Sequence, residues 1–99
     1  MPAYILVEIQ VHDAAKFEEY KKKAPPSIAA YGGKYLVRGG AVETLDGTWQ
    51  PERLVVLEFP SMERAREWYN CDMYAEAIKL RHASATSQFI LVEGLGKNV

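Results

Sequence analysis

The sequence predicts an α+β domain with the ferredoxin-like order βαββαβ, a four-stranded antiparallel sheet with two helices on one face. Segments rich in β-branched and aromatic residues alternate with stretches of helical periodicity. The two halves of the chain repeat the same strand, helix, strand unit. The 99 residues, 48% of them hydrophobic, suit a single core, which we place in one domain at residues 1–95 with a short C-terminal tail at 96–99.

The first predicted strand spans residues 3–11, AYILVEIQV. Asp13 is a favourable N-cap for the helix that follows. Pro25-Pro26 predicts a break or kink in that helix, because proline lacks the backbone N–H that the helix needs. Residues 28–31 could resume it for a turn, and Gly32-Gly33 predicts its end.

Two further strands are predicted in the middle of the chain. Residues 34–38 form a short strand that ends at Gly39-Gly40. Residues 41–50 are predicted to form an extended segment that turns at Asp46-Gly47, a common turn dipeptide. Apolar residues then alternate along a third strand at residues 53–59.

The second helical region follows Pro60, with Ser61 as its predicted N-cap. Residues 70–72 indicate a break, after which Asp72 could cap a further helix. Residues 88–93 form the fourth predicted strand.

The sheet face opposite the helices would be bare in a monomer. It would carry Tyr4 and Leu6 together with Leu54 and Val56, without the polar alternation that a solvated face needs. We therefore predict a homodimer in which two sheets pack face to face as a dimeric α+β barrel. The alternative is a two-layer monomer with an open face polar enough for water.

Composition and charge exclude several classes of partner. Twelve basic and thirteen acidic residues give a net charge of −1, which argues against electrostatic capture of nucleic acid or an anionic membrane. Cys71 is the single cysteine, so no intrachain disulfide is possible and a reducing compartment is favoured. The sequence shows neither signal-peptide features nor an apolar run of membrane-spanning length, and we predict a cytoplasmic protein.

Six parts of the sequence carry a resemblance to a known family: AYILVEIQVHD, Tyr20, YGGKYLVRGG, DGTWQPERLVVLEFPS, AREWYNCDMYAEAIKLR and ILVEGL. In these parts the chain resembles the domain-of-unknown-function family thirteen-thirty (DUF1330), within the dimeric α+β barrel superfamily. Cys71-Asp72 departs from the small residue and carboxylate, such as Pro-Glu, that the resemblance leads us to expect. The resemblance implies the fold and dimerisation rather than an activity. Superfamily relatives include cofactor-free monooxygenases acting on aromatic polyketides, muconolactone-type isomerases and haem enzymes, which share a pocket between sheet and helices.

Motifs for nucleotide binding, hydrolase nucleophiles and metalloprotease zinc are absent from the sequence. His12 and His82 are the only histidines, and they lie in different predicted elements. A metal site requires several ligands at short spacing, so we predict no metal and no cofactor.

Arg38 and Glu58 are the charged candidates for a site. Arg38 could anchor an anionic group, or form a buried ion pair with Glu58 or Glu8. Glu58 lies in an apolar strand, where desolvation could make it a base; the alternative is a paired structural carboxylate at the dimer interface.

Five tyrosine and tryptophan side chains could either line a pocket or belong to the core. Trp68, Tyr69 and Tyr74 flank the helix break, whereas Tyr20 and Tyr31 lie on the first helix and at its end. Such amphipathic rings could line an apolar cavity with polar tips. Arg81 could be a further polar pocket residue or a surface ion-pair partner, and the latter is favoured.

The function predicted from these residues is binding of a small aromatic or anionic metabolite between sheet and helices. The protein could act as a cofactor-independent monooxygenase-like or isomerase-like enzyme. The predicted ligand-binding residues are Arg38, Tyr20, Tyr31, Trp68, Tyr69 and Tyr74, with Glu58 as the catalytic candidate. The alternative is a non-catalytic binding or regulatory module, or a structural dimer without a pocket.

Overall fold

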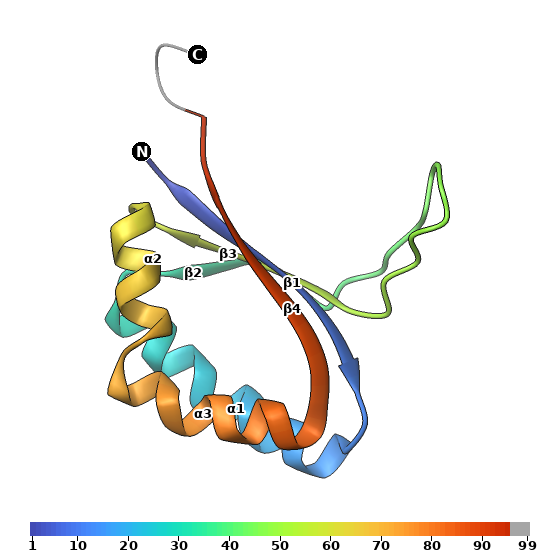
Figure 1. The fold of residues 1–99 in the computed structure, drawn as a ribbon, viewed down its shortest axis with the longest axis horizontal. Coiled ribbons are helices and arrows are strands. Elements are labelled where there is room, and N and C mark those ends of the chain that lie inside the picture. Colours follow the sequence, from blue (N-terminus) through green and yellow to red (C-terminus); the bar gives the residue numbers. More distant parts are fainter. Residues whose placement is uncertain (96–99) are drawn as a thin grey trace.

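A computed structural model describes residues 1–95 and has the predicted α+β architecture (Figure 1). The helices gather on one side of a four-stranded sheet, and the predicted tail at 96–99 lies outside the described residues. The elements in chain order are β1 (Ala3–Val11), α1 (Ala14–Ala30), β2 (Lys34–Arg38), β3 (Leu54–Phe59), α2 (Met62–Tyr69), α3 (Asp72–Ser84) and β4 (Ala85–Glu93).

The strands follow the order β2-β3-β1-β4, and every neighbouring pair is antiparallel. In the register, Val7 of β1 lies opposite Val55 of β3 and Phe89 of β4. Residues directly opposite one another on neighbouring strands point to the same face of the sheet. Val7 and Val55 are buried, so this is the face beneath the helices. This face forms the floor of the core, so it also forms one wall of any site between sheet and helices.

The core joins the inner sheet face to the three helices. Trp68 of α2 and Tyr74 of α3 are completely buried, and their ring centroids lie 4.1 Å apart. Burying a large apolar side chain contributes about 1.5–3 kcal/mol relative to leaving it exposed. The buried hydrophobic cluster consists of Ile5, Val7, Ile9, Phe17, Tyr20, Ala24, Ile28, Val55, Leu57, Phe59, Ala65, Trp68, Tyr74 and Ala77.

The first helix is continuous through Pro25 and Pro26, so the predicted break is wrong. Asp13 caps its start as predicted, with the side chain accepting a hydrogen bond from the Lys16 N–H. Pro25 has no N–H to donate to the carbonyl of Lys21, four residues earlier. Arg38 of β2 supplies a donor instead, at 3.0 Å from Nη2 to that oxygen.

The second helical region divides into α2 and α3 at the predicted break. Ser61 caps α2 as predicted, and its Oγ accepts from the Arg64 N–H at 3.1 Å. The N-cap of α3 is Cys71 and not Asp72: its Sγ accepts from the Tyr74 N–H at 3.4 Å. The lone thiol therefore has a structural position at a helix start.

Between β2 and β3, residues 39–53 form an arm that projects from the sheet on the side away from the helices (Figure 1). The arm has no strand at 41–50, and it turns at Gly47, whose φ of +88° suits glycine. Leu45 and Trp49 are 89% and 62% exposed there. The arm thus presents large apolar side chains to solvent.

The outer sheet face carries the apolar residues that the sequence predicts. Leu6 is 36% exposed, and Leu54 and Val56 are half-buried. Ile90 and Val92 of β4 extend the apolar surface and are 61% and 45% exposed. Within residues 1–95, no helix is both long and apolar enough to cross a membrane.

Candidate functional site

A buried chain of polar groups joins α1 to α3. The hydroxyls of Tyr20 and Tyr74 lie 2.7 Å apart. The Arg81 guanidinium donates to the Tyr74 hydroxyl at 2.7 Å through Nη1 and to the Tyr69 hydroxyl at 3.3 Å through Nη2. Tyr74 and Arg81 meet because they lie seven residues apart, two turns along one face of α3.

Arg81 is a buried cation without a carboxylate partner. It is only 3% exposed, and none of the ion pairs within residues 1–95 includes it. Its guanidinium carbon lies 4.0 Å from the ring centroid of Phe89, and its Nε has no hydrogen-bond partner. Burial of an unpaired charge is unfavourable, so an anion bound nearby would stabilise this arrangement.

The surrounding tyrosines do not supply that anion. Burial raises the pKa of Tyr74 far above its ordinary value, and the neighbouring Tyr20 raises it further. Burial also raises the pKa of Tyr20, despite its hydrogen bond to Tyr74. Both phenols therefore stay neutral at physiological pH, and the guanidinium keeps its charge.

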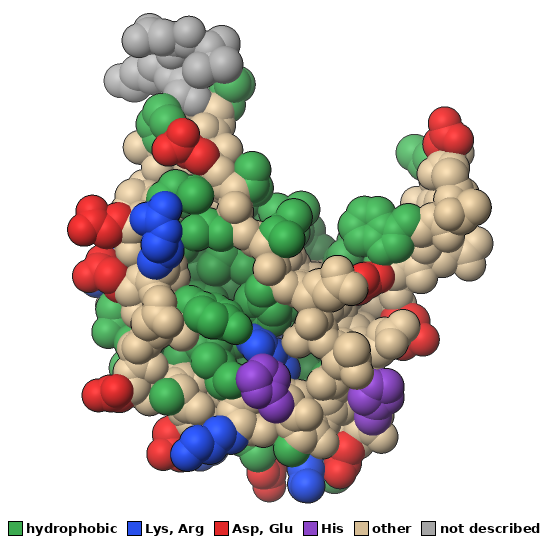
Figure 2. Space-filling view, in the orientation of Figure 1, with side chains coloured by type: hydrophobic (Ala, Val, Ile, Leu, Met, Phe, Trp, Pro, Cys, Tyr) green, Lys and Arg blue, Asp and Glu red, His purple; other side chains and the backbone are tan. Residues whose placement is uncertain are grey.

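A groove of about 280 Å³ lies between α2 and β4. In Figure 2 the molecule is hollowed there, with a hydrophobic floor and with basic and histidine side chains toward its lower end. Tyr69 and Phe89 both line the groove and both contact Arg81, so the buried cation lies next to two residues of the groove wall. The groove is lined by Ile5, Ala65, Arg66, Tyr69, Asn70, Phe89, Ile90 and Leu91.

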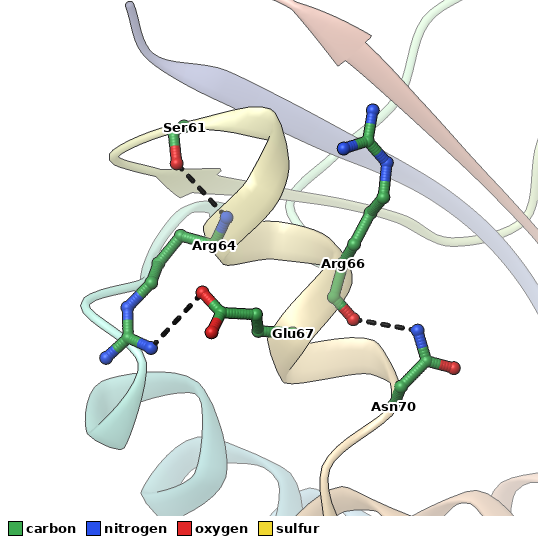
Figure 3. A network of polar contacts seen from close by, with 5 residues as sticks. All are labelled: Ser61, Arg64, Arg66, Glu67 and Asn70. Atoms are coloured by element: carbon green, nitrogen blue, oxygen red, sulfur yellow. Dashed lines mark hydrogen bonds and ion pairs between the residues drawn. The ribbon is translucent and has the colours of Figure 1, made fainter.

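The end of α2 sets the polar rim of the groove (Figure 3). Asn70 donates from Nδ2 to the Arg66 carbonyl at 2.9 Å and closes the last turn. The Arg64 side chain forms an ion pair with Glu67, with 3.5 Å between Nη1 and Oε1. The Arg66 side chain extends instead on the side of the strands, and it takes part in none of the ion pairs of the described chain.

The structure brings four of the predicted aromatic residues together. Tyr20, Trp68, Tyr69 and Tyr74 form one cluster, with Tyr69 and Tyr74 centroids 5.8 Å apart. Trp68 belongs to the core, where its Nε1 donates to Ser27 Oγ at 3.0 Å. Tyr69 is the member of this cluster that reaches the groove.

Tyr31 and Arg38 lie outside this cluster. Tyr31 is half-buried, with the Arg64 guanidinium 4.7 Å from its ring centroid. Arg38 is exposed on β2, so the predicted buried ion pair is wrong. Its proposed partner Glu8 accepts a hydrogen bond from Trp49 Nε1 at 2.9 Å.

Glu58 lies on the outer sheet face, away from the helices. It forms an ion pair with Lys34 of β2 at 3.0 Å, in agreement with the paired structural interpretation. Glu58 lies opposite Tyr4 in the register, whereas its neighbours Leu57 and Phe59 face the core. Its side chain therefore does not point into the space between sheet and helices.

The sequence interpretation of Arg81 as a surface ion-pair partner is wrong, since the residue is buried among tyrosines. Its spacing from Tyr74 and Ile78 along one helical face was the available signal. Phe89, Arg66 and Asn70 were missed as site residues, because only the packing of α2 against β4 brings them together.

The two histidines occupy separate positions. His12 Nε2 lies 2.8 Å from Thr86 Oγ1, and His82 Nε2 lies 3.3 Å from Arg81 Nη2. Nowhere in the part of the chain that the structure describes do three or more potential metal ligands gather.

Together, fold and groove define a ferredoxin-like α+β protein with a partly polar groove between sheet and helices. The family model "Domain of unknown function (DUF1330)" matches residues 2–95, and the chain belongs to this family. No curated protein matches the chain in sequence.

Solved structures share the fold. A protein of unknown function from Rhodopseudomonas palustris is 22% identical with a TM-score of 0.79, over 96% of this chain and 83% of that one. The cofactor-independent oxygenase SnoaB from Streptomyces nogalater is 16% identical with a TM-score of 0.65, over 97% and 95%. A dimeric protein of unknown function and ferredoxin-like fold from Bacteroides fragilis is 10% identical with a TM-score of 0.55, over 94% and 96%.

Proposed function

We propose that the groove between α2 and β4 binds a small aromatic metabolite that carries an anionic group. The observation that carries this proposal is the buried Arg81, which forms no ion pair within residues 1–95 and contacts Tyr69 and Phe89, two residues that line the groove. A wall of two aromatic rings in contact with a cation combines apolar contact with favourable electrostatics for an anion.

Tyr69 links the cation to the ligand. Its hydroxyl oxygen accepts from Arg81 Nη2, which leaves the hydroxyl proton free to donate into the groove. A hydrogen bond donor polarised by a cation is stronger than an ordinary phenol. Ile5, Phe89 and Leu91 would hold the apolar body of the ligand, with Arg66 at the rim.

The same arrangement supports a cofactor-independent reaction of the monooxygenase or isomerase type. Either reaction would begin with loss of a ligand proton to water, which gives an enolate or phenolate whose developing charge requires a preorganised donor, and the monooxygenase reaction would use molecular oxygen as its oxidant. Tyr69 in contact with Arg81 supplies that donor. The fold that the chain shares with a cofactor-independent oxygenase agrees with such a role.

A thermal-shift screen of aromatic acids, lactones and quinones tests the proposal. A ligand that binds only the folded state raises the unfolding temperature by mass action. We expect Tyr69→Phe and Arg66→Gln to reduce the shift, and Arg64→Gln, which alters the same helix away from the groove, to preserve it. The absence of any shift, or an equal loss in Arg64→Gln, would contradict the proposal.

The alternative is a non-catalytic binding or regulatory module, or a structural dimer. It is favoured by the close packing of Trp68 and Tyr74, which leaves no large chamber beside them. Turnover of any ligand identified in the screen distinguishes the two functions. A bound ligand that is recovered unchanged would support the module.

We propose that the chain forms a homodimer through its outer sheet face. The support is an apolar hollow with a volume of about 330 Å³ on that face. It includes Leu6, Val56 and Ile90, with Trp49 of the arm at its edge. Contiguous apolar side chains exposed on one face are typical of association sites.

Light scattering after size exclusion tests the dimer. A lysine in the centre of the face, Leu6→Lys, should give a monomer, because the partner would bury its charge. Met73→Lys is the matched control, since Met73 is 50% exposed on α3 of the helical layer. Dimers of equal stability in both variants would place the interface elsewhere.

We further propose a cytoplasmic location, supported by the unpaired thiol of Cys71 at the start of α3. Fractionation of the source cells, followed by detection with an antibody, tests it. Recovery in a secreted or membrane fraction would contradict it.

A further inference from the structure

Two arginines gather at the edge of the sheet opposite the groove. Arg38 ends β2 and Arg53 immediately precedes β3, whereas the groove borders β4. The guanidinium carbon of Arg38 lies 4.6 Å from the Tyr35 ring centroid, and that of Arg53 lies 5.5 Å from the Phe17 ring centroid. Both arginines line one cavity of about 20 Å³.

Arg53 is held in a position that only glycine at residue 39 allows. Gly39 has a φ of +73°, and a Cβ there would collide with the Arg53 guanidinium. The Nε of Arg53 is buried and has no hydrogen-bond partner in the described chain. A buried donor without an acceptor is unfavourable, so the position favours an added acceptor.

Arg38 is held by the irregular hydrogen bonding of α1. Because Pro25 has no N–H, the Lys21 carbonyl is free to accept from Arg38 Nη2. One contact of this kind uses one of the five guanidinium N–H groups. The remaining donors of Arg38 stay available at the cavity mouth.

Neither arginine forms an ion pair with an acidic side chain among residues 1–95. The adjacent Lys21 already has a partner in Glu18, at 2.8 Å. The hydrogen bond from Lys21 lowers the pKa of Glu18, and the charge of Arg53 contributes a smaller effect in the same direction. The Lys21–Glu18 pair is neutral overall, so Arg38 and Arg53 leave an excess of positive charge at the opening of the cavity.

We propose that Arg38 and Arg53 form an oxyanion-binding site for the carboxylate or phosphate group of a small molecule. The planar forks of two arginines match the geometry of either group. The cavity holds little more than one water molecule, so the oxyanion binds at its mouth. This site does not rest on the function proposed for the groove, because Arg81, Tyr69 and Arg66 take no part in it.

Titration of isotope-labelled protein with benzoate and with inorganic phosphate, followed by NMR, tests the site. We expect resonances of residues 38, 39 and 53 to shift. Arg38→Gln or Arg53→Gln should raise the dissociation constant of whichever anion binds more tightly by about tenfold or more. Arg64→Gln is the matched control, because that guanidinium also lies over a tyrosine ring. Benzoate binding alone would identify a carboxylate, and phosphate binding alone a phosphate.

Pro25→Ala is a second variant that leaves every charge in place. Its new N–H would pair with the Lys21 carbonyl, release Arg38 and weaken the same probe severalfold while the helix stays folded. The proposal is overturned if both glutamine variants bind as well as the parent, or if Arg64→Gln weakens binding equally. It is also overturned if Tyr69→Phe, and not Arg38→Gln, removes the response, since the probe would then occupy the groove.

Discussion

Removal of a single hydroxyl, in Tyr74→Phe, tests whether the buried polar chain is an integral part of the folded state. Tyr74 occupies its centre: its oxygen accepts from Arg81 at 2.7 Å and lies 2.7 Å from the Tyr20 hydroxyl. Phenylalanine keeps the ring, which stacks on Trp68, and removes only the oxygen. Tyr20→Phe is the matched comparison, because it removes a hydroxyl at one end of the same chain.

The expected magnitudes differ for a physical reason. Without the Tyr74 hydroxyl, Arg81 Nη1 and the Tyr20 hydroxyl both lose a partner inside the protein. Each buried group left unsatisfied costs about 1–3 kcal/mol, so Tyr74→Phe should lower the free energy of unfolding by about 3 kcal/mol. Tyr20→Phe leaves Tyr74 bonded to Arg81 and should cost about 1 kcal/mol.

Urea denaturation at one fixed protein concentration measures both effects. The double variant should cost less than the sum of the single variants by about 1 kcal/mol, because the two hydroxyls share one hydrogen bond. An unchanged denaturant dependence would confirm that the unfolded states are comparable. Equal destabilisation in the two single variants would refute the argument that Tyr74 is the centre of the chain.

Three further changes have defined outcomes. Gly33→Ala would place a Cβ 2.6 Å from the Phe59 ring, so thermal unfolding should show a loss of about 1–3 kcal/mol unless the ring can move. Asp13→Ala removes the N-cap of α1 and should cost about 1 kcal/mol in urea, whereas Asp13→Asn should restore most of it. Burial raises the pKa of Tyr35 to about 12 and raises the pKa of Tyr74 further. Because these folded-state pKa values exceed the unfolded value, the free energy of unfolding should be unchanged below pH 10 and should fall above it. Ultraviolet absorbance should show that these two phenols ionise at higher pH than free tyrosine. Ionisation of all tyrosines near pH 10 in the folded protein would contradict this order.

The starts of α1 and α2 were predictable because the capping signal is local. Asp13 and Ser61 each accept a backbone N–H three residues later, and both residue types have that preference wherever they precede a helix. The continuity of α1 through Pro25 was not predictable from neighbouring residues. The compensating donor is Arg38, thirteen positions further along the chain.

The candidate site shows the same division between local and distant information. The clustering of Tyr69 and Tyr74 was predictable, because they flank a helix break with amphipathic side chains. The environment of Arg81 depends on Tyr20 from α1 and Phe89 from β4, and sequence spacing does not reveal that these elements meet. A charged residue near a helix end therefore looked like a surface residue and proved to be buried.

The hydrogen bond from Arg38 to the Lys21 carbonyl has a consequence for how this family can vary. Pro25 and Arg38 depend on one backbone oxygen: without a proline N–H at residue 25, the Lys21 carbonyl accepts from the guanidinium instead. A lineage that replaces Pro25 closes the helix and removes the contact that holds Arg38 in place. The two positions should consequently change together across homologues, and an alignment in which they vary independently would show that other contacts hold the arginine.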